Sequence, residues 1–474
     1  MNYKGILFFL GINSLIVSFF SILNILYSFY FNFILDINSY LICFFTTLLL
    51  GLLFCFIGYK FNKNISISDQ ILLFILTFVF IPLFLSLPYY FSIYNLNFLN
   101  SYFESVSGFT TTGFSTIKNV NNIDEPLLLW RSSSQWLGGL FFIIATIGTL
   151  SSKQIKINPA YLITSSDTIN NFYSNFNYNF IKVLLIYFFS TILIIFLYSL
   201  FNLRLFDSFN LAFTVISSGG FIPSNFLSNI IKTDTQILIL SLTLLFPIFN
   251  FYLIFKIFSN KFKFKEHQED FHLGIMIIFL TLSLYFFIIP NKNLLDIFLG
   301  VVSSVSTSGI SNYFSSSVDM SLFFILLTII GGSLISASSG FKYVRFYILL
   351  KISYNEIYKL VKPINIFNKN LFNSESKIED LDSKITFLIF VLFIISIFVL
   401  SSILTFDDMT FENAFKLSIL TLTNTVTSSL YGLDNLSFFD LNIMSKMSLI
   451  VFMILGKIEL IAVLYLIKKF IFRE

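Results

Sequence analysis

The strongest constraint on this chain is a short apolar run that ends in small hydroxyl residues and lies between two much longer apolar segments. The run covers roughly residues 98–109, about half of the ~20 residues that a helix needs to cross a bilayer. Thr-Thr-Thr-Gly follows it at 110–113. Three later stretches repeat the arrangement, at 209–221, 298–310 and, more faintly, 415–429. Four such stretches between pairs of spanning segments are what an ion pathway with fourfold pseudo-symmetry requires.

Composition places the chain in a membrane. Hydrophobic residues make up 56% of the sequence and charged residues only 11%, whereas soluble domains carry about 25% charged residues. Apolar runs of spanning length fall at about 5–30, 38–58, 70–93, 130–150, 180–202, 234–257, 271–290, 320–350, 384–404 and 445–467. We therefore expect an all-α integral membrane protein in contact with lipid.

The order of these runs predicts an internal repeat. The first two form a plain two-helix hairpin, which we assign to residues 1–62. The other eight form four pairs, and each pair encloses one short stretch. The predicted membrane–pore-loop–membrane repeats are residues 63–155, 156–262, 263–360 and 361–474, arranged with pseudo-fourfold symmetry.

The basic residues predict the orientation. If the short stretches lie outside, 21 of the 29 Lys and Arg residues fall on the inner side. This bias predicts a multi-pass protein with both termini in the cytoplasm. Because the basic residues sort by membrane side, the net charge of +4 does not indicate nucleic-acid binding.

The chemistry of the short stretches favours cations. A dehydrated cation needs a ring of oxygens, which backbone carbonyls supply when the chain is extended and faces a pathway. Such backbone is tolerated at membrane depth only where protein or water surrounds it. A helix that ends at the pathway also directs the negative end of its dipole there.

Two further intramembrane features are candidates for a gate. Eight of the ten residues at 331–340 are Gly, Ser or Ala, which is typical either of close helix packing or of a broken helix under a filter. Lys457 lies within the last apolar run, where a charge is functional by default. It forms an electrostatic barrier in the pathway, pairs with a carboxylate such as Glu459, or extends to a membrane interface. Residues two apart do not face each other on a helix, which disfavours the pair with Glu459. Glu104, in the first short run, is expected to hydrogen-bond free backbone amides behind the filter rather than to contact an ion.

Several motifs resemble one known family. They are ESVSGFTTTGFS at 104–115, WRSSSQWLGG at 130–139, SSGGF at 217–221, STSGI at 306–310 and GGSLISASSGFKYVR at 331–345. The chain is similar in these motifs to the Trk/Ktr/HKT potassium transporters, and its extra N-terminal hairpin favours the Trk-like branch. LGKIEL at 455–460 resembles the segment where that family usually carries Arg, with Lys457 in its place.

The resemblance implies site residues, an ion and partners. The implied K⁺ filter is Thr111, Thr112, Gly113, Ser218, Gly219, Gly220, Thr307, Ser308, Gly309, Asn424, Thr425 and Val426. The implied gate is Gly331, Gly332, Ser333, Ser336, Ser338, Ser339 and Gly340, together with Lys457. The family also implies potassium uptake across the plasma (cell inner) membrane, a homodimer and a cytoplasmic nucleotide-binding regulatory subunit. K⁺ is the transported ion, and no cofactor is expected in this chain.

The alternatives differ in ion and in class. Val426 stands where the other three filter segments have Gly, and a β-branched residue disfavours a positive φ, so a distorted filter in a Na⁺-conducting or Na⁺-coupled carrier stays open. A non-conducting scaffold is a further alternative, as is symport in place of channel-like flow. No catalytic dyad and no GxxxxGK[ST] loop occurs, so we do not expect an enzyme. His267 and His272 have no third metal ligand nearby in the sequence and are interpreted as solvated or capping.

Overall fold

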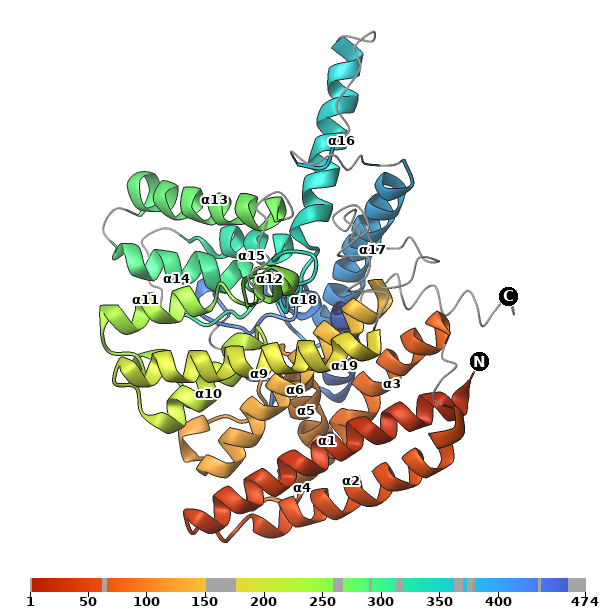
Figure 1. Cartoon of the computed structure of the whole chain (residues 1–474). Coiled ribbons are helices and arrows are strands. Elements are labelled where there is room, and N and C mark those ends of the chain that lie inside the picture. The colour runs from red at the N-terminus through yellow and green to blue at the C-terminus, as the bar shows by residue number, and fades with distance from the viewer. Residues whose placement is uncertain are drawn as a thin grey trace.

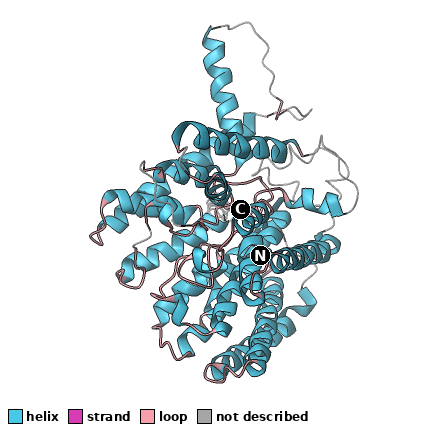
Figure 2. Cartoon of the chain, turned by 90° about the vertical axis from the view of Figure 1, so that its left-hand side faces the viewer, coloured by secondary structure: helices cyan, strands magenta, loops and turns pink. Residues whose placement is uncertain are grey.

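The computed structural model describes residues 2–61, 66–150, 176–258, 267–289, 292–312, 319–361, 370–372, 378, 380–433 and 436–458. Within these ranges every regular element is helical, which confirms the predicted all-α class (Figure 2). Six described helices are long and apolar enough to cross a membrane, by length and composition. They are Tyr3–Tyr30, Ile37–Phe61, Ser68–Phe91, Ile181–Leu200, Gln268–Ile288 and Asp380–Thr405.

Four helices of equal length lie between the longer ones. Each has 12 residues: α5 (Phe98–Phe109), α10 (Leu205–Ile216), α14 (Leu294–Val305) and α18 (Phe411–Leu422). The longer helices are α1 (Tyr3–Tyr30), α2 (Ile37–Gly58), α3 (Ile67–Leu85), α6 (Glu125–Leu150), α9 (Phe176–Leu200), α13 (Gln268–Ser283), α17 (Asp380–Thr405) and α19 (Ile443–Ile458). The one-turn helix α4 (Leu87–Phe91) extends α3 beyond Ser86. The short helices have the size expected from the short apolar runs.

Two of the expected spans are interrupted. The run at 234–257 forms α11 (Asp234–Thr243) and α12 (Phe251–Phe258), and Pro247 lies in the non-helical segment between them. The run at 320–350 forms α15 (Ser321–Ile330) and α16 (Tyr343–Val361). The second interruption was expected from the Gly and Ser residues, but the first was not. The C-terminal part of α16 projects beyond the rest of the described structure (Figure 1).

Small residues set the packing of the N-terminal hairpin, α1 against α2. A Cβ placed on Gly11 would lie 2.8 Å from the backbone N of Cys55, and one on Gly58 would lie 2.4 Å from the carbonyl O of Lys4. The two backbones therefore approach more closely than any side chain would allow. Such close approach at small residues is typical of helix pairs in membranes.

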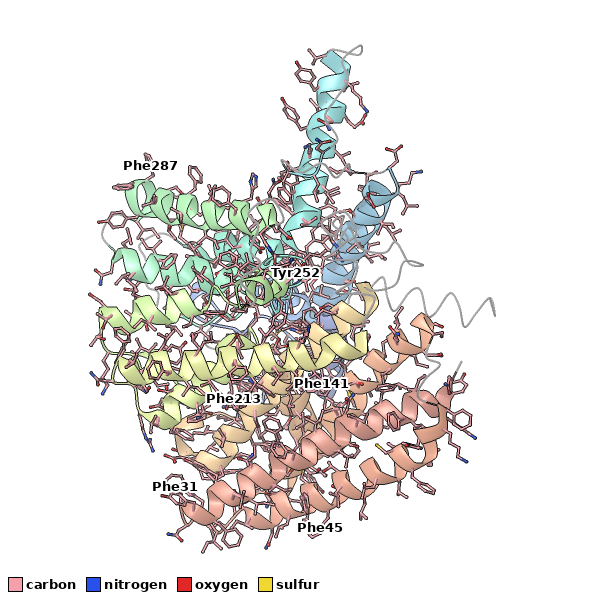
Figure 3. The ribbon with its side chains drawn as sticks, viewed as in Figure 1. Phe31, Phe45, Phe141, Phe213, Tyr252 and Phe287 are labelled. Atoms are coloured by element: carbon pink, nitrogen blue, oxygen red, sulfur yellow. The ribbon has the colours of Figure 1, made fainter. Side chains whose placement is uncertain are left out.

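The large aromatic side chains divide between the surface and the interior. Phe45 on α2 and Phe287 on η5 (Leu284–Ile288), the short π-helix that follows α13, are exposed and point away from the structure, whereas Phe141 on α6 is buried (Figure 3). An exposed apolar surface around a buried interior is what a lipid environment favours. This distribution agrees with the membrane class expected from composition.

Asp36, at the turn of the hairpin, attaches the hairpin to the first repeat, and Asp124 of that repeat interacts with it. Asp36, between α1 and α2, accepts a hydrogen bond from the backbone N of Ile93 at 3.0 Å. Asp124, just before α6, accepts one from the Tyr94 hydroxyl at 3.1 Å. Burial, followed by the charge of Asp36, raises the pKa of Asp124 to about 6. Burial likewise raises the pKa of Asp36.

We expect this attachment to make stability depend on pH. The ordinary pKa of Asp is about 4, so between about pH 4 and pH 6 the folded protein binds more protons than the unfolded chain. The free energy of unfolding therefore falls as pH rises through that window. Thermal unfolding in detergent at pH 5.0 and 7.0 should give midpoints that differ by roughly 2–5 °C, with the higher one at pH 5.0. Asp124→Asn should remove most of this difference, and an equal difference in the variant would contradict the assignment.

Candidate functional site

The four short helices end in the same backbone conformation. The second residue after each helix has a positive φ: 60° at Thr111, 62° at Ser218, 60° at Thr307 and 50° at Asn424. The next N–H donates to the carbonyl five residues back, at 2.9, 2.8, 3.1 and 2.9 Å in chain order. This is the Schellman motif, in which the positive-φ position is usually Gly. Thr at that position is strained, and strain of this kind concentrates at functional sites.

The four segments then diverge two residues later. Gly113 and Gly309 have positive φ values of 88° and 69°, whereas Gly220 and Val426 do not. The fourth segment therefore accommodates Val426 without the strained backbone that a β-branched residue would suffer there. Up to Asn424 its backbone follows the other three.

These segments meet in the interior of the bundle. A Cβ placed on Gly113 would lie 3.0 Å from the Cα of Gly220 and 3.1 Å from the Cβ of Val426. One on Gly309 would lie 2.7 Å from the carbonyl O of Val426. Side chains also join neighbouring segments: Asn424 Nδ2 donates to Thr112 Oγ1 at 3.0 Å, and Ser218 Oγ lies 3.1 Å from Thr307 Oγ1. The four predicted filter segments are thus brought together.

A buried ion pair supports the first segment from behind. Glu104 on α5 is fully buried, and its Oε2 accepts from the backbone N of Thr116 at 2.8 Å. Its Oε1 lies 2.9 Å from Nε of Arg131 on α6. The Arg131 guanidinium lies over the Phe221 ring, 4.1 Å from its centroid. Glu104 therefore has the contacts expected of a scaffold residue.

The rest of the 130–139 motif also contacts the filter segments. Gln135 Oε1 accepts from the backbone N of Phe221 at 3.2 Å. A Cβ on Gly138 would lie 1.8 Å from the carbonyl O of Phe109, so only glycine allows α6 to cross the end of α5. This motif fixes the first two segments relative to each other.

The Gly/Ser stretch at 331–340 folds back against the third filter segment, residues 307–309. Gly331 and Gly340 have positive φ values of 65° and 85°, and they lie in a largely buried non-helical segment that runs from 331 to 342. The backbone N of Ser339 donates to Thr307 Oγ1 at 2.9 Å, which joins the loop to the filter segment. Ser333, at the other side of the loop, instead donates its backbone N to the carbonyl O of Ile248 at 2.8 Å. We refer to residues 331–342 as the intramembrane loop.

Lys457 joins the loop to the first segment. It is completely buried, and its Nζ donates to Thr111 Oγ1 at 2.7 Å, to Ser339 Oγ at 3.0 Å and to the carbonyl O of Ala337 at 3.4 Å. The Phe142 ring lies 4.3 Å from the same Nζ. The predicted gate lysine thus lies between filter and loop. Glu459, the alternative partner, lies outside the described residues.

A second buried lysine holds the loop itself. Lys342 Nζ donates to Ser336 Oγ at 3.1 Å and to the carbonyl oxygens of Ser336 and Ser338. Carbonyls freed by the break in the helix are thereby satisfied, as burial at membrane depth requires. Lys342 belongs to the motif at 331–345, but no role was predicted for it from the sequence.

Two acidic residues near the loop were not predicted from the sequence. Glu269 and Asp270 lie in the first turn of α13 and are buried, and His267 Nδ1 lies 3.4 Å from Asp270 Oδ2. His267 occupies the N-cap position of α13, one of its two predicted roles, but its ring is buried rather than solvated and makes no side-chain cap. The sequence signal that could have found Glu269 and Asp270 is that two adjacent acidic residues precede the apolar run at 271–290.

Comparisons with known proteins agree with this geometry. No family model matches the chain. The chain is 26% identical over 508 aligned residues to the uncharacterized cation transporter MJ1485 of Methanocaldococcus jannaschii, an alignment that covers 100% of this chain and 97% of that protein. It is 25% identical over 404 residues to the Trk system potassium uptake protein TrkH of Escherichia coli, which covers 82% and 83%.

A solved structure shares the fold. The crystal structure of the potassium transporter TrkH from Vibrio parahaemolyticus superimposes with a TM-score of 0.83 and 21% identity, over 98% of each chain. These relatives are named as transporters or uptake proteins, in keeping with the expectation that the chain is not an enzyme. The resemblance to Trk-like membrane subunits is thereby confirmed, because the chain shares their fold over nearly its whole length and part of their sequence.

Proposed function

We propose that this chain takes up K⁺ through one pathway lined by the four converging segments. The proposed filter consists of residues 111–113, 218–220, 307–309 and 424–426. The main support is the fourfold Schellman ending, which turns the chain at the same point in each repeat and is followed by non-helical backbone. The four helix C-termini also direct their negative dipole ends to the same place, which favours a cation.

We propose residues 331–340 and Lys457 as the gate. The Lys457 ammonium group bonds Thr111, the first residue of its filter segment, and Ser339 of the intramembrane loop. A K⁺ leaving the filter would therefore meet a positive charge. The membrane potential would supply the driving force, at about 2.3 kcal/mol per charge for each 100 mV. No cofactor in this chain is needed for that step. The geometry favours neither symport nor channel-like flow.

The proposed setting is the plasma (cell inner) membrane, with lipid around the helices and both termini cytoplasmic. The support for this orientation is the bias of Lys and Arg in the sequence. We propose a homodimer that uses the projecting helix α16, whose exposed apolar residues include Leu350, Tyr354, Ile357 and Leu360. The basic inner loops would suit a cytoplasmic nucleotide-binding regulatory subunit. Mass measurement of the purified protein in detergent tests the dimer.

The proposal is tested by ion flux into proteoliposomes made with the purified protein. Gly113→Ala should abolish K⁺ uptake, because its Cβ would press on Gly220 and Val426 at a φ of 88°. The matched control is Gly274→Ala, since nothing lies within 4 Å of a Cβ at that position and flux should be unchanged. Normal flux in Gly113→Ala would favour a different pathway, whereas a parent protein with no flux above that of empty vesicles would favour the non-conducting scaffold.

Val426 supports a second candidate, a Na⁺-conducting or Na⁺-coupled carrier. Its side chain occupies the space beside Gly220, because a Cβ on Gly220 would lie 2.4 Å from the Cβ of Val426. The fourth filter segment therefore presents a branched apolar side chain to its neighbours. Uptake of K⁺ and Na⁺ measured separately in the same vesicles distinguishes the two candidates, and faster Na⁺ uptake would favour the second.

A further inference from the structure

Two non-helical segments from different repeats pair beside the proposed gate. Residues 244–250 separate α11 from α12, and the intramembrane loop separates α15 from α16. The backbone N of Ser338 donates to the carbonyl O of Pro247 at 3.1 Å. In the opposite direction, the backbone N of Phe251 donates to the carbonyl O of Ile335 at 2.7 Å. Each segment thus satisfies backbone groups that the other's break leaves free.

Two adjacent carboxylates hold these segments from the first turn of α13. Glu269 Oε1 accepts from the backbone N of Leu334, in the intramembrane loop, at 3.0 Å. Asp270 Oδ1 accepts from the backbone N of Asn250, at the end of the other segment, at 2.8 Å. The two carboxylates are 3% and 4% exposed. Successive residues on a helix point in directions about 100° apart, so one helix turn can reach both segments.

The two sides of the intramembrane loop are bonded to different parts of the protein. On one side Ser339 is bonded to Thr307 of the proposed filter and to Lys457 of the proposed gate. On the other side Leu334 is bonded to Glu269. A displacement of the first turn of α13 would therefore pull on the side of the loop that does not touch the filter.

We infer that Glu269 and Asp270 are positioning residues that hold the gate closed. The inference rests on the proposed function, since it assigns these carboxylates to the control of that pathway. Each carboxylate accepts from a backbone N–H that a helix break leaves free, so the pair joins α13 to both non-helical segments. Loss of the Glu269 contact leaves the Leu334 N–H without its acceptor and frees the loop to move away from Lys457.

Thiol accessibility tests this inference without any ion having to permeate. Ala337→Cys is placed in the loop of a protein whose Cys43 and Cys55 are replaced by alanine, and a membrane-impermeant maleimide is added from the cytoplasmic side. Ala337 is buried, so the parent should react slowly. Glu269→Ala should react at least tenfold faster. Glu269→Gln should stay near the parent rate, because its amide oxygen can still accept from Leu334.

Glu125→Ala provides the matched control. Glu125 also lies in the first turn of a helix, α6, and bonds Tyr27 and Arg204, and neither of these partners belongs to the gate. The reaction rate in this variant should equal that of the parent. An unchanged rate in Glu269→Ala, or an equal rise in Glu125→Ala, would overturn the inference. If Glu269→Ala does not fold, Asp270→Ala serves instead, because it removes the acceptor of the Asn250 N–H: a rate at least threefold above the parent supports the inference, and the parent rate refutes it.

Discussion

Replacement of Lys457 by methionine is expected to raise K⁺ flux into proteoliposomes by about thirtyfold. The ammonium group bonds Thr111 at the proposed filter and Ser339 in the loop, so a cation passing between them would approach it closely. At a separation of about 8 Å and an effective dielectric constant of about 20, the repulsion is about 2 kcal/mol. That free energy corresponds to roughly a thirtyfold change in rate.

Two variants separate the effect of the Lys457 charge from that of its side-chain bulk. Methionine keeps much of the apolar stem that packs near Phe142 but removes the charge. Lys457→Arg keeps the charge and should leave flux within a few-fold of the parent. Unchanged or lower flux in the methionine variant, at normal yield and thermal stability, would show that Lys457 is not a barrier.

Replacement of Arg131 by methionine is expected to have the largest effect on stability. Arg131 is 3% exposed, and its ion pair with Glu104 lies behind the first filter segment. Its removal leaves a buried carboxylate without its countercharge, which typically costs about 3–5 kcal/mol. The midpoint of thermal unfolding in detergent should fall by roughly 5–10 °C. Uptake of K⁺ should fall too, because Glu104 holds Thr116 just beyond the filter.

A double-mutant cycle separates the ion pair from simple packing. Glu104→Gln in the Arg131→Met background removes the uncompensated charge and still offers an oxygen to Thr116. The double variant should therefore regain at least a third of the lost unfolding temperature. Strictly additive losses in the two single variants would mean that the residues stabilise the fold independently.

The repeat was predictable because its signals are local. The first short apolar run, predicted at about residues 98–109, forms a helix with those bounds, since the hydroxyl and glycine residues that follow do not continue it. The same pattern locates the other three short helices. The Gly, Ser and Ala residues at 331–340 indicated either close packing or a broken helix, and the family resemblance favoured the broken helix that the structure has.

The contacts around the gate were not predictable, because they depend on partners distant in sequence. The break at 244–250 contains one proline, which in an apolar helix often causes only a kink. The hydrogen bonds that stabilise this break come from residues near Ile335, about 90 positions later. The positive φ of Thr111 was also hidden, since the local preference of a β-branched residue opposes it.

The side chains at the four strained positions have a consequence for selectivity. Thr111 and Thr307 use their hydroxyl oxygens to hold Lys457 and the loop, while Ser218 and Asn424 bond neighbouring segments. The Thr111 and Thr307 hydroxyl groups therefore belong both to the proposed filter and to the contacts that hold the proposed gate. A change that loosens one also relaxes the spacing of the other, so variants with a permanently open pathway should discriminate less sharply among monovalent cations.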